Sequence, residues 1–404
     1  MKVLLVNITG KTGSTGKITS DIRSYLLDQG HDAVVAYSVD DIKEKGYYKL
    51  SKRWELAIAL RLTRLGRSNY KGNPFALCRL KTIIEKEQPD IVHLHCINCN
   101  CINIYKTFEY LAKTNTRTVV THHAEFFYTG SCPHSFDCMK FVNNQCNGCK
   151  DLLYSTSNIL FANPHKNWLR MYEAINRFDI RKLYFVAVSP WVRERSIMSP
   201  IVNKYPSKTI LNGLDTNIFH YINDNSVLER RIKRTNRKIV LHISPFFNPI
   251  GNSTKGGNYV IEMAKQFPGV LFVVVASSSI KTNDLPENVL FWGKATSQNE
   301  LANLYSIADI TLLTSKRETF SMVTAESLCC GTPVVGFLAG GPESIAIDKY
   351  CSFVEYGNTS MLYDSLRQYL SFEYDKKMIS SEACKKYSKD VMGEEYLQLY
   401  KQLL

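Results

Sequence analysis

Short, continuous apolar runs recur along the first half of the chain and predict strands. They are KVLLVN at 2–7, DAVVAY at 32–37, DIVHLH at 90–95, RTVVTHH at 117–123, ILFAN at 159–163 and LYFVAVS at 183–189. Runs of this length, separated by helical patterns, are typical of strands buried on both faces of a parallel sheet. One such helical pattern, at 17–31, places apolar side chains on one face and ends at Gly30.

The same alternation restarts after a polar, charged break at 223–238. Further apolar runs follow at 239–244, 270–277, 289–293, 309–315, 333–337 and 351–356. We therefore expect an α/β protein with two doubly wound Rossmann-like domains that face each other across a cleft. The predicted boundary follows Ser189, so that the domains are 1–189, with a Cys-rich insertion near 130–150, and 190–385. An amphipathic helix at 386–404 is set apart, and packing on the first domain is one option for it.

Composition limits the class of protein without choosing a function. The 404 residues are 45% hydrophobic and 22% charged, as in ordinary globular proteins. The apolar run at the start is too short for a signal peptide, and about 18 consecutive apolar residues, enough to span a bilayer, occur nowhere. We therefore expect a cytoplasmic protein. The net charge of +13 favours a polyanionic partner, which could be nucleic acid, an anionic membrane or a phosphorylated substrate.

The first predicted strand leads into NITGKTGSTGKIT at 7–19, which is similar to a triphosphate-binding loop. Such a P-loop needs Gly, four residues, then Gly-Lys and a Ser or Thr whose hydroxyl binds the metal ion. Here Gly10 lies one residue too far from Gly16, and Ile18 replaces the hydroxyl residue. A P-loop-like nucleotide hydrolase is therefore kept only as an alternative.

The most informative stretch is TSKRETFSMVTAESLCCGTPVVGFLAGGPES at 314–344. The turn of Thr319, Phe320 and Ser321 offers backbone N–H groups at a helix N-terminus, which is a natural cradle for a diphosphate. Glu326, inside the helix, could accept hydrogen bonds from ribose hydroxyls. For an arbitrary pair such as Glu318 and Glu326, two solvated surface glutamates would be the simpler interpretation.

This stretch resembles the glutamate-pair motif of the retaining glycosyltransferases of family 4. The resemblance includes the seven residues between Glu318 and Glu326, the segments CGTPVV and AGGPES, the stretch at 291–313 and TILNGLDTNIF at 209–219. It implies a two-domain GT-B fold whose C-terminal domain binds a nucleotide-diphosphate sugar. By position, Glu326 would hold the ribose, Glu318 the donor sugar, and Thr319, Phe320 and Ser321 the diphosphate or sugar.

The resemblance also implies roles for residues outside the motif. Lys255 would neutralise the departing diphosphate, although an isolated lysine at a helix N-terminus is usually a surface residue. His123, rather than His122, falls at the family's strand-end histidine, which contacts the donor sugar, and His95 is a weaker candidate for the acceptor pocket. The loop with Gly13 and Gly16 resembles the family's glycine-rich first loop, where backbone approaches donor phosphates and acceptor.

Four cysteines, Cys132, Cys138, Cys146 and Cys149, lie within eighteen residues. They could form a closed structural zinc site, because four thiols complete a tetrahedral ligand set. Free thiols in a loop remain the alternative. No Asp-x-Asp triplet occurs in the sequence, so the usual carboxylate pair for bridging a metal ion to a diphosphate is missing and catalysis is expected to need no metal.

The segment at 50–72 reads as a basic amphipathic helix. It could rest on an anionic membrane and meet a lipid-linked acceptor, or simply pack on its own domain. The resulting prediction is a retaining, metal-independent hexosyltransferase that acts on a glycan or lipid-linked acceptor in surface polysaccharide biosynthesis, with no nucleic acid partner. A zinc-containing nucleic-acid-binding protein is the other alternative, although the charge is spread over both halves without a known module.

Overall fold

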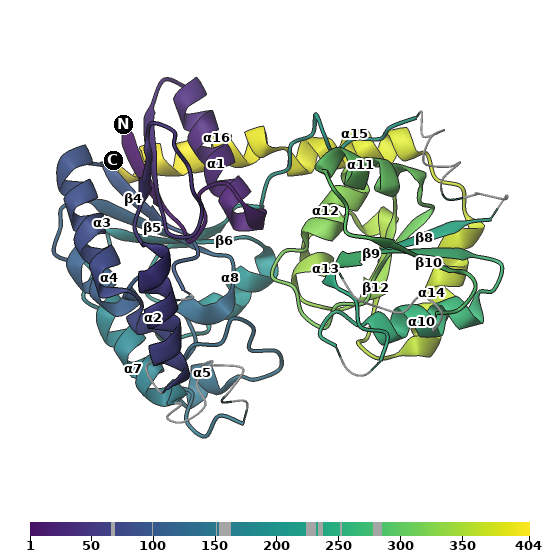
Figure 1. The fold of residues 1–404 in the computed structure, drawn as a ribbon, viewed down its shortest axis with the longest axis horizontal. Helices are drawn as coiled ribbons and strands as arrows, with labels where there is room; N and C mark the ends of the chain where they lie inside the picture. Colours follow the sequence, from purple (N-terminus) through teal and green to yellow (C-terminus); the bar gives the residue numbers. More distant parts are fainter. Residues whose placement is uncertain are drawn as a thin grey trace. The chain divides into compact units, whose positions relative to one another are not determined.

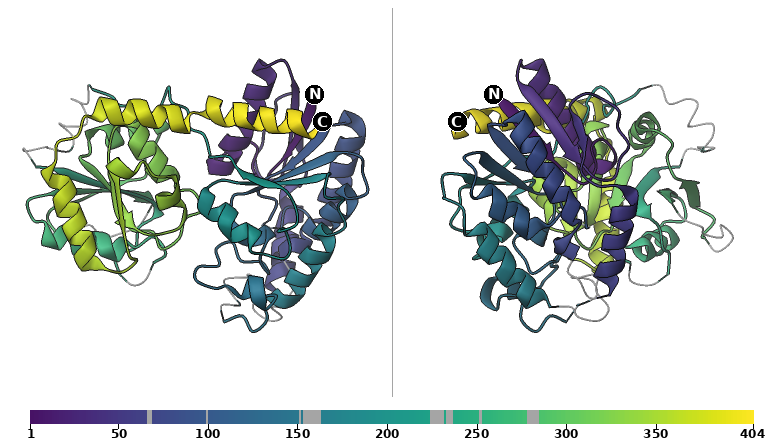
Figure 2. Two further views of the ribbon diagram at one scale, coloured as in Figure 1. Left: turned by 180° about the vertical axis from the view of Figure 1, so that it is seen from behind. Right: turned by 60° about the vertical axis from the view of Figure 1, so that its left-hand side comes forward.

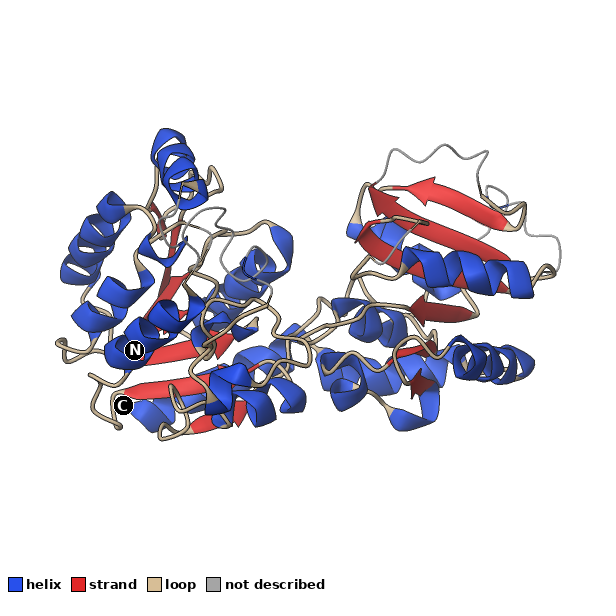
Figure 3. Cartoon of the chain, turned by 90° about the horizontal axis from the view of Figure 1, so that it is seen from below, coloured by secondary structure: helices blue, strands red, loops and turns tan. Residues whose placement is uncertain are grey.

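The computed structural model describes residues 1–65, 69–98, 100–150, 152, 163–223, 232, 237–250, 253–277 and 285–404. The chain divides into two compact units (Figure 1). Unit 1 contains Met1–Leu211 and Met392–Leu404, and unit 2 contains Asn212–Val391. In each unit, helices enclose a parallel sheet (Figure 3). Among the described residues, no helix combines the length and the apolar character needed to cross a bilayer.

Unit 1 is built on a seven-stranded sheet in the order β3-β2-β1-β4-β5-β6-β7, with every pair parallel. The strands are β1 (Lys2–Val6), β2 (Asp32–Tyr37), β3 (Tyr47–Lys49), β4 (Ile91–Leu94), β5 (Arg117–His122), β6 (Leu183–Ala187) and β7 (Ser207–Thr209). The helices are α1 (Gly13–Asp28), α2 (Arg53–Arg64), α3 (Pro74–Glu87), α4 (Ile104–Leu111), α5 (Lys140–Asn143), α7 (Pro164–Ile175) and α8 (Pro190–Ile197), with 3-10 turns η1 (Asn69–Lys71) and η2 (Glu125–Phe127).

The last helix, α16 (Lys389–Leu403), completes the core of unit 1 (yellow in Figure 2). Its buried side chains join those of α1 and of the central strands in one apolar cluster. Contact with α1 is so close that a Cβ atom on Gly393 would lie 2.3 Å from Cγ of Tyr25. The Tyr25 hydroxyl also donates to Glu394 at 2.7 Å. Residues 392–404 are therefore an integral layer of unit 1.

Unit 1 extends to Leu211, beyond the predicted boundary at Ser189. The reason is that Ser189 begins α8 by accepting a hydrogen bond from the Val192 amide, and the chain then returns as β7 to pair with β6. A three-residue edge strand such as β3 or β7 leaves no apolar run, so neither was predicted. The strand predicted at 159–163 falls on residues 159–162, which lie outside the described part of the chain.

Unit 2 is built on a six-stranded parallel sheet in the order β10-β9-β8-β11-β12-β13. The strands are β8 (Ile239–Phe246), β9 (Leu271–Ser277), β10 (Val289–Gly293), β11 (Ile310–Leu313), β12 (Val334–Phe337) and β13 (Cys351–Val354). The helices are α10 (Gly257–Gln266), α11 (Gln298–Ile307), α12 (Met322–Cys329), α13 (Gly341–Ile345), α14 (Thr359–Ser371) and α15 (Lys376–Tyr387), with a 3-10 turn η4 (Asp348–Tyr350).

The strand order of unit 2 reverses direction between β8 and β11. Chain connections run outward to β9 and β10 on one side and to β12 and β13 on the other, which is the doubly wound order 3-2-1-4-5-6. In such sheets, loops on either side of the reversal diverge at the carboxyl edge and leave room for a ligand. The loops that follow β8 and β11 are therefore the first place to look for a site.

Candidate active site

Two predicted residues meet at this strand reversal. Lys255 lies in the loop after β8, directly before Gly256, the N-cap of α10, and Glu318 lies in the loop after β11. The Lys255 ammonium and the Glu318 carboxylate form an ion pair with Nζ and Oε1 2.5 Å apart. Both side chains are partly exposed, so the pair lies at the surface of the carboxyl edge where a ligand can reach it.

Hydrogen bonds to backbone carbonyls fix the two loops against each other. The Lys316 amide donates to the Thr254 carbonyl at 2.9 Å, and the Thr314 hydroxyl donates to the Lys255 carbonyl at 2.8 Å. Gly256 has φ of +66°, and a Cβ atom there would lie 2.2 Å from the Thr314 carbonyl oxygen. Only glycine meets both demands, because it has no Cβ and adopts positive φ at little cost.

The AGGPES segment supports the other side of the Glu318 loop. The Glu318 amide donates to the Ala339 carbonyl at 3.0 Å, and the Gly341 amide donates to the Glu318 carbonyl at 2.9 Å. A Cβ atom on Gly341 would lie 2.5 Å from the carbonyl carbon of Thr319. Glu343 accepts from the Gly340 amide at 2.6 Å and so holds this segment in place. Glu318 is thus fixed through its backbone on both sides.

The turn of Thr319, Phe320 and Ser321 leads into α12. Ser321 is the N-cap and accepts a hydrogen bond from the Thr324 amide at 3.2 Å. Its φ of +77° is costly for a residue with a side chain, and such strain persists only where surrounding contacts impose it. The Phe320 ring is buried in the core and helps to hold this turn in place.

Glu326, on α12, accepts a hydrogen bond from the Tyr305 hydroxyl at 3.0 Å. Tyr305 is fully buried on α11, and burial first, then the Glu326 carboxylate, raise the pKa of its hydroxyl well above 10. The tyrosine therefore stays protonated and holds one carboxylate oxygen in a fixed direction. Sequence analysis missed Tyr305, because nothing in the helical pattern of 298–307 distinguishes it from an ordinary core aromatic residue.

In unit 1, the predicted His123 lies at the end of a buried polar chain. His123 and His95 are joined by a hydrogen bond of 2.9 Å between Nε2 and Nδ1. The His95 ring lies 3.9 Å from that of His93, which bonds to the hydroxyls of Thr121 and Tyr400, each at 2.7 Å. Burial lowers the pKa of His123 to about 3, so its imidazole is neutral at pH 7. Tyr400 belongs to α16, which thus supports these histidines.

His122 has a different environment from its neighbour. Its ring stacks on Phe185 with centroids 5.0 Å apart and an angle of 6° between the planes. Neither ring nitrogen has a hydrogen-bond partner among the described residues, and the side chain is fully buried. His122 is therefore a packing residue, whereas His123 is 9% exposed and hydrogen-bonded. This arrangement is consistent with the preference for His123, whose contact with a donor sugar remains a prediction.

The glycine-rich loop after β1 binds an internal carboxylate. The amides of Gly10, Lys11 and Thr12 donate to the same Asp40 oxygen at 2.8, 2.8 and 3.1 Å. Burial by itself raises the pKa of Asp40, but the hydrogen bonds from Thr12, Lys11 and Gly10 outweigh it and lower the pKa. Asp40 thus occupies the amide nest that would hold phosphate in a P-loop.

Gly13 and Gly16, which were predicted to bind the donor, allow the conformation and the packing of this loop. Gly13 begins α1 with φ of +69°, and no atom lies within 4 Å of the place a Cβ would take. A Cβ atom on Gly16 would lie 2.6 Å from the Thr9 hydroxyl oxygen, so Gly16 allows α1 to pack on its own loop. Their approach to donor phosphates or acceptor remains a prediction.

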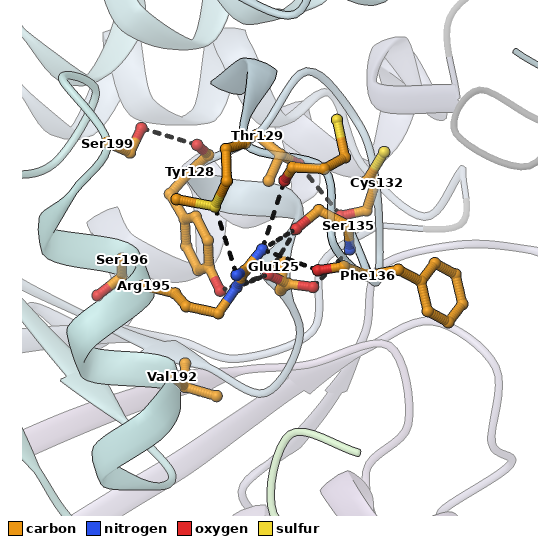
Figure 4. Close-up of polar contacts among 12 residues, drawn as sticks. Glu125, Tyr128, Thr129, Cys132, Ser135, Phe136, Val192, Arg195, Ser196 and Ser199 are labelled. Carbon is orange, nitrogen blue, oxygen red and sulfur yellow. Dashed lines mark hydrogen bonds and ion pairs between the residues drawn. The ribbon is translucent and has the colours of Figure 1, made fainter. Parts of the chain in front are cut away.

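A buried ion pair fixes the segment that follows His123 (Figure 4). Glu125 is fully buried, and its Oε1 lies 2.9 Å from Nε of Arg195 on α8. Its carboxylate also accepts from the Ser135 hydroxyl at 2.8 Å and the Tyr128 hydroxyl at 3.1 Å. The Arg195 guanidinium bonds in turn to Ser135 and to the Phe136 carbonyl. This network, which sequence analysis missed, orders the first half of the Cys-rich segment.

None of the four cysteines of that segment, as described, forms a disulfide. Cys146 accepts a hydrogen bond from the Gly130 amide at 3.2 Å, and burial raises the pKa of its thiol to about 12. Within the described ranges, no three or more His, Cys, Asp or Glu side chains gather closely enough to hold a metal ion. Zinc binding by the four thiols remains a prediction from the sequence.

Solved structures share this architecture over the whole chain. Sucrose-phosphate synthase from Thermosynechococcus elongatus superposes with a TM-score of 0.71 at 15% identity, covering 100% of this chain and 99% of the other. Anabaena HepE, solved in complex with UDP-glucose, superposes with a TM-score of 0.65 at 17% identity, covering 100% of both chains. The fold is that of the GT-B glycosyltransferases, as predicted.

Comparison of sequences gives the family. The model described as Glycosyltransferase Family 4 matches residues 16–218, and that of Glycosyl transferases group 1 matches residues 233–391. N-acetyl-alpha-D-glucosaminyl L-malate synthase of Bacillus anthracis is 22% identical over 366 residues, which cover 89% of this chain and 85% of that protein. The chain belongs to glycosyltransferase family 4, which confirms the resemblance seen in its motifs.

Replacing His122 with Phe is expected to change the acid stability of the protein. Burial lowers the pKa of His122 from 6.5 to about 3, so below pH 6.5 the unfolded chain binds a proton that the folded chain does not. The stabilisation is therefore complete above about pH 6.5 and is lost as the pH falls toward 3. His122→Phe should flatten the pH dependence of unfolding free energy by up to about 1.4 kcal/mol per pH unit.

Urea denaturation at several values between pH 7 and pH 5 measures this slope. Phe178→Leu, a buried substitution in unit 1 that removes no titratable group, is the control and should leave the slope unchanged. An unchanged slope in His122→Phe would show that His122 does not titrate as a buried neutral group.

Proposed function

We propose that this glycosyltransferase moves a sugar from a nucleotide-diphosphate sugar to a hydroxyl group of a glycan or lipid-linked acceptor. The observation that carries the proposal is the Lys255–Glu318 ion pair at the strand reversal of unit 2, beside the N-terminus of α12. UDP-glucose in the Anabaena HepE structure supports this donor class. Surface polysaccharide biosynthesis at the cytoplasmic face of a membrane is the setting proposed from the sequence.

Lys255 and Glu318 are proposed to act together, as an ion pair that separates when the donor binds. In the free protein, Glu318 holds the ammonium in position. A bound diphosphate carries more negative charge than one carboxylate and attracts the ammonium, which releases Glu318 to accept hydrogen bonds from the sugar hydroxyls. Lys255 then stabilises the negative charge that develops on the leaving diphosphate. The amides of Thr319, Phe320 and Ser321 at the start of α12 add to this stabilisation.

Glu326 is proposed to bind the ribose. The Tyr305 hydroxyl holds its carboxylate from within the core, which fixes the direction in which it accepts hydrogen bonds from ribose hydroxyls. A preoriented acceptor gains affinity because less conformational freedom is lost on binding. From the resemblance alone, neutral His123 is proposed to contact a donor sugar through hydrogen bonds rather than as a covalent nucleophile.

The transfer step is proposed to proceed on one face of the sugar, with retention. The bond between the anomeric carbon and the phosphate oxygen breaks, and the bond from the acceptor oxygen to that carbon forms on the same face. The acceptor proton passes to the departing phosphate oxygen, so atoms and charge balance. No metal is needed in this scheme, because Lys255 and the α12 amides meet the diphosphate charge and the sequence has no Asp-x-Asp pair.

Substitutions at the donor site test the proposal. With a panel of nucleotide sugars, release of nucleoside diphosphate should identify a donor. Lys255→Ala should then lower kcat about 10²-fold to 10³-fold, by analogy with the loss of one transition-state donor. Glu326→Gln should raise the donor KM about tenfold or more, because a hydrogen bond to a charged group contributes about 1.5–3 kcal/mol.

Lys265→Ala and Glu287→Gln are matched controls, because both residues are exposed in unit 2. They should leave kcat and KM unchanged. The proposal fails if no donor in the panel is bound or cleaved, or if Glu326→Gln behaves like Glu287→Gln.

The stereochemical outcome is a separate prediction. With a donor that carries an α-linked nucleotide, the first product observed by NMR should have the small anomeric proton coupling of an α-glycoside. Retention follows if the acceptor attacks the face that the diphosphate leaves. A β-configured first product would contradict the proposed step while leaving the donor site intact.

Structural zinc in the Cys-rich segment is proposed on the sequence alone. Elemental analysis of the purified chain should give about one zinc per chain if Cys132, Cys138, Cys146 and Cys149 bind a closed tetrahedral ion. Cys149→Ser should lose that metal, whereas Cys78→Ser, at an exposed position on α3, should retain it. If the protein contains no metal and all four thiols of this segment react with a thiol reagent, the zinc proposal is wrong.

A further inference from the structure

Helix α2 packs on unit 1 through its polar face (dark blue in Figure 1). Glu55, Ala59 and Thr63 are its buried residues. Glu55 receives two hydrogen bonds from the Arg79 guanidinium, at 2.6 and 2.7 Å, and a third from the Asn73 amide at 2.8 Å. An ion pair and hydrogen bonds, rather than large apolar side chains, therefore attach α2 to its own unit.

A neighbouring face of α2 carries an exposed row of large apolar side chains. Trp54, Ile58, Leu62 and Leu65 follow one another at intervals of four, four and three residues, the spacing of a single helix face. Their exposed fractions are 55%, 49%, 39% and 66%. Phe75, at the start of α3, is 51% exposed and lies beside Trp54, with ring centroids 6.3 Å apart. We call these five residues the α2 ridge.

Cations surround the α2 ridge. Lys52, Arg53, Arg61 and Arg64 are exposed on the same helix or at its cap, whereas the one acidic residue of α2, Glu55, is buried against Arg79. The helix therefore exposes apolar and positively charged side chains to solvent, and its own acidic residue is buried. An amphipathic helix with apolar residues and arginines at its outer face matches the headgroup region of an anionic bilayer.

The charges on α2 also favour an anionic bilayer, rather than a second copy of the chain, as the partner of the α2 ridge. A two-fold interface would place the same patch on both sides, so that these arginines would face their own counterparts without acidic residues between them. Anionic headgroups instead complement every exposed charge on α2. The chain's net charge of +13 attracts the whole molecule to the same surface.

We propose that the α2 ridge inserts into the headgroup region of a bilayer that contains anionic lipids, with the arginines in contact with lipid phosphates. The proposal does not rest on sugar transfer, because it concerns binding to lipid in the absence of donor and acceptor. It gives the glycosyltransferase a membrane-facing side that is defined by named residues.

Vesicle sedimentation without nucleotide sugar tests the proposal. The full chain is mixed with vesicles of phosphatidylcholine alone or with about one third phosphatidylglycerol, at low and high salt. We expect binding to the anionic vesicles that weakens with salt. Ile58→Ser combined with Leu62→Ser should reduce binding at least about tenfold, because several methylene and methyl groups no longer enter the bilayer. Ile180→Ser combined with Met361→Ser is the matched control, since these side chains are also about half exposed.

The arginines are tested separately. Arg61→Gln combined with Arg64→Gln should weaken binding to anionic vesicles about tenfold or more and should leave any weak binding to neutral vesicles unchanged. Lipids brominated near the headgroup should quench part of the tryptophan fluorescence of the wild-type chain, and Trp54→Phe should lose that quenching. Thermal unfolding of all variants should match the wild type, because the changed side chains are exposed.

Three outcomes would overturn the proposal. The wild-type chain could fail to bind anionic vesicles, or the Ile58 and Leu62 variant could bind as tightly as its matched control. A concentration-dependent dimer that this variant abolishes, without any vesicle binding, would assign the α2 ridge to a second copy. Loss of vesicle binding with unchanged transferase activity on a soluble acceptor would support the proposal and separate it from the catalytic site.

Discussion

The adjacency of β8 and β11 is the constraint on which the candidate donor site of unit 2 depends. Because these strands are neighbours in the sheet and far apart in the chain, the loops that follow them bring Lys255 and Glu318 within 2.5 Å. Gly256 and Gly341 make the close backbone approaches that this meeting requires. An ion pair between two loops would contribute little in open solvent, but here hydrogen bonds to the backbone of each loop fix both partners before any ligand arrives.

In each unit, a buried hydrogen-bond network fixes the orientation of a predicted site residue. Tyr305 fixes Glu326 from within unit 2, and the chain from Tyr400 through His93 and His95 ends beside His123 in unit 1. A polar group inside a core is costly unless it is hydrogen-bonded, so each network restricts its members to few arrangements. The orientations of Glu326 and His123 are therefore set by hydrogen-bond partners that are buried away from solvent.

Sequence patterns predicted the buried strands well, because a short continuous apolar run between helical patterns is typical of a strand buried on both faces. The same logic failed for β3 and β7, whose three residues at a sheet edge need no apolar run, and for the end of unit 1 at Leu211. Glu318 and Glu326 could be named from their motif, and Lys255 from the wider resemblance to the family. Tyr305, Glu125 and Asp40 could not, because each acts through a partner 21 to 70 residues away in the chain.

The position of α16 has a consequence for the order in which the protein is made. Unit 1 begins at Met1 but is completed only by Met392–Leu404, which the ribosome synthesises after all of unit 2. Until then the apolar side chains of α1 lack the part of their packing that α16 supplies, and His93 lacks the Tyr400 hydroxyl. The nascent chain thus carries an unfinished first core while its second core folds, so a stalled or shortened chain exposes the α16-binding face to chaperones and proteases.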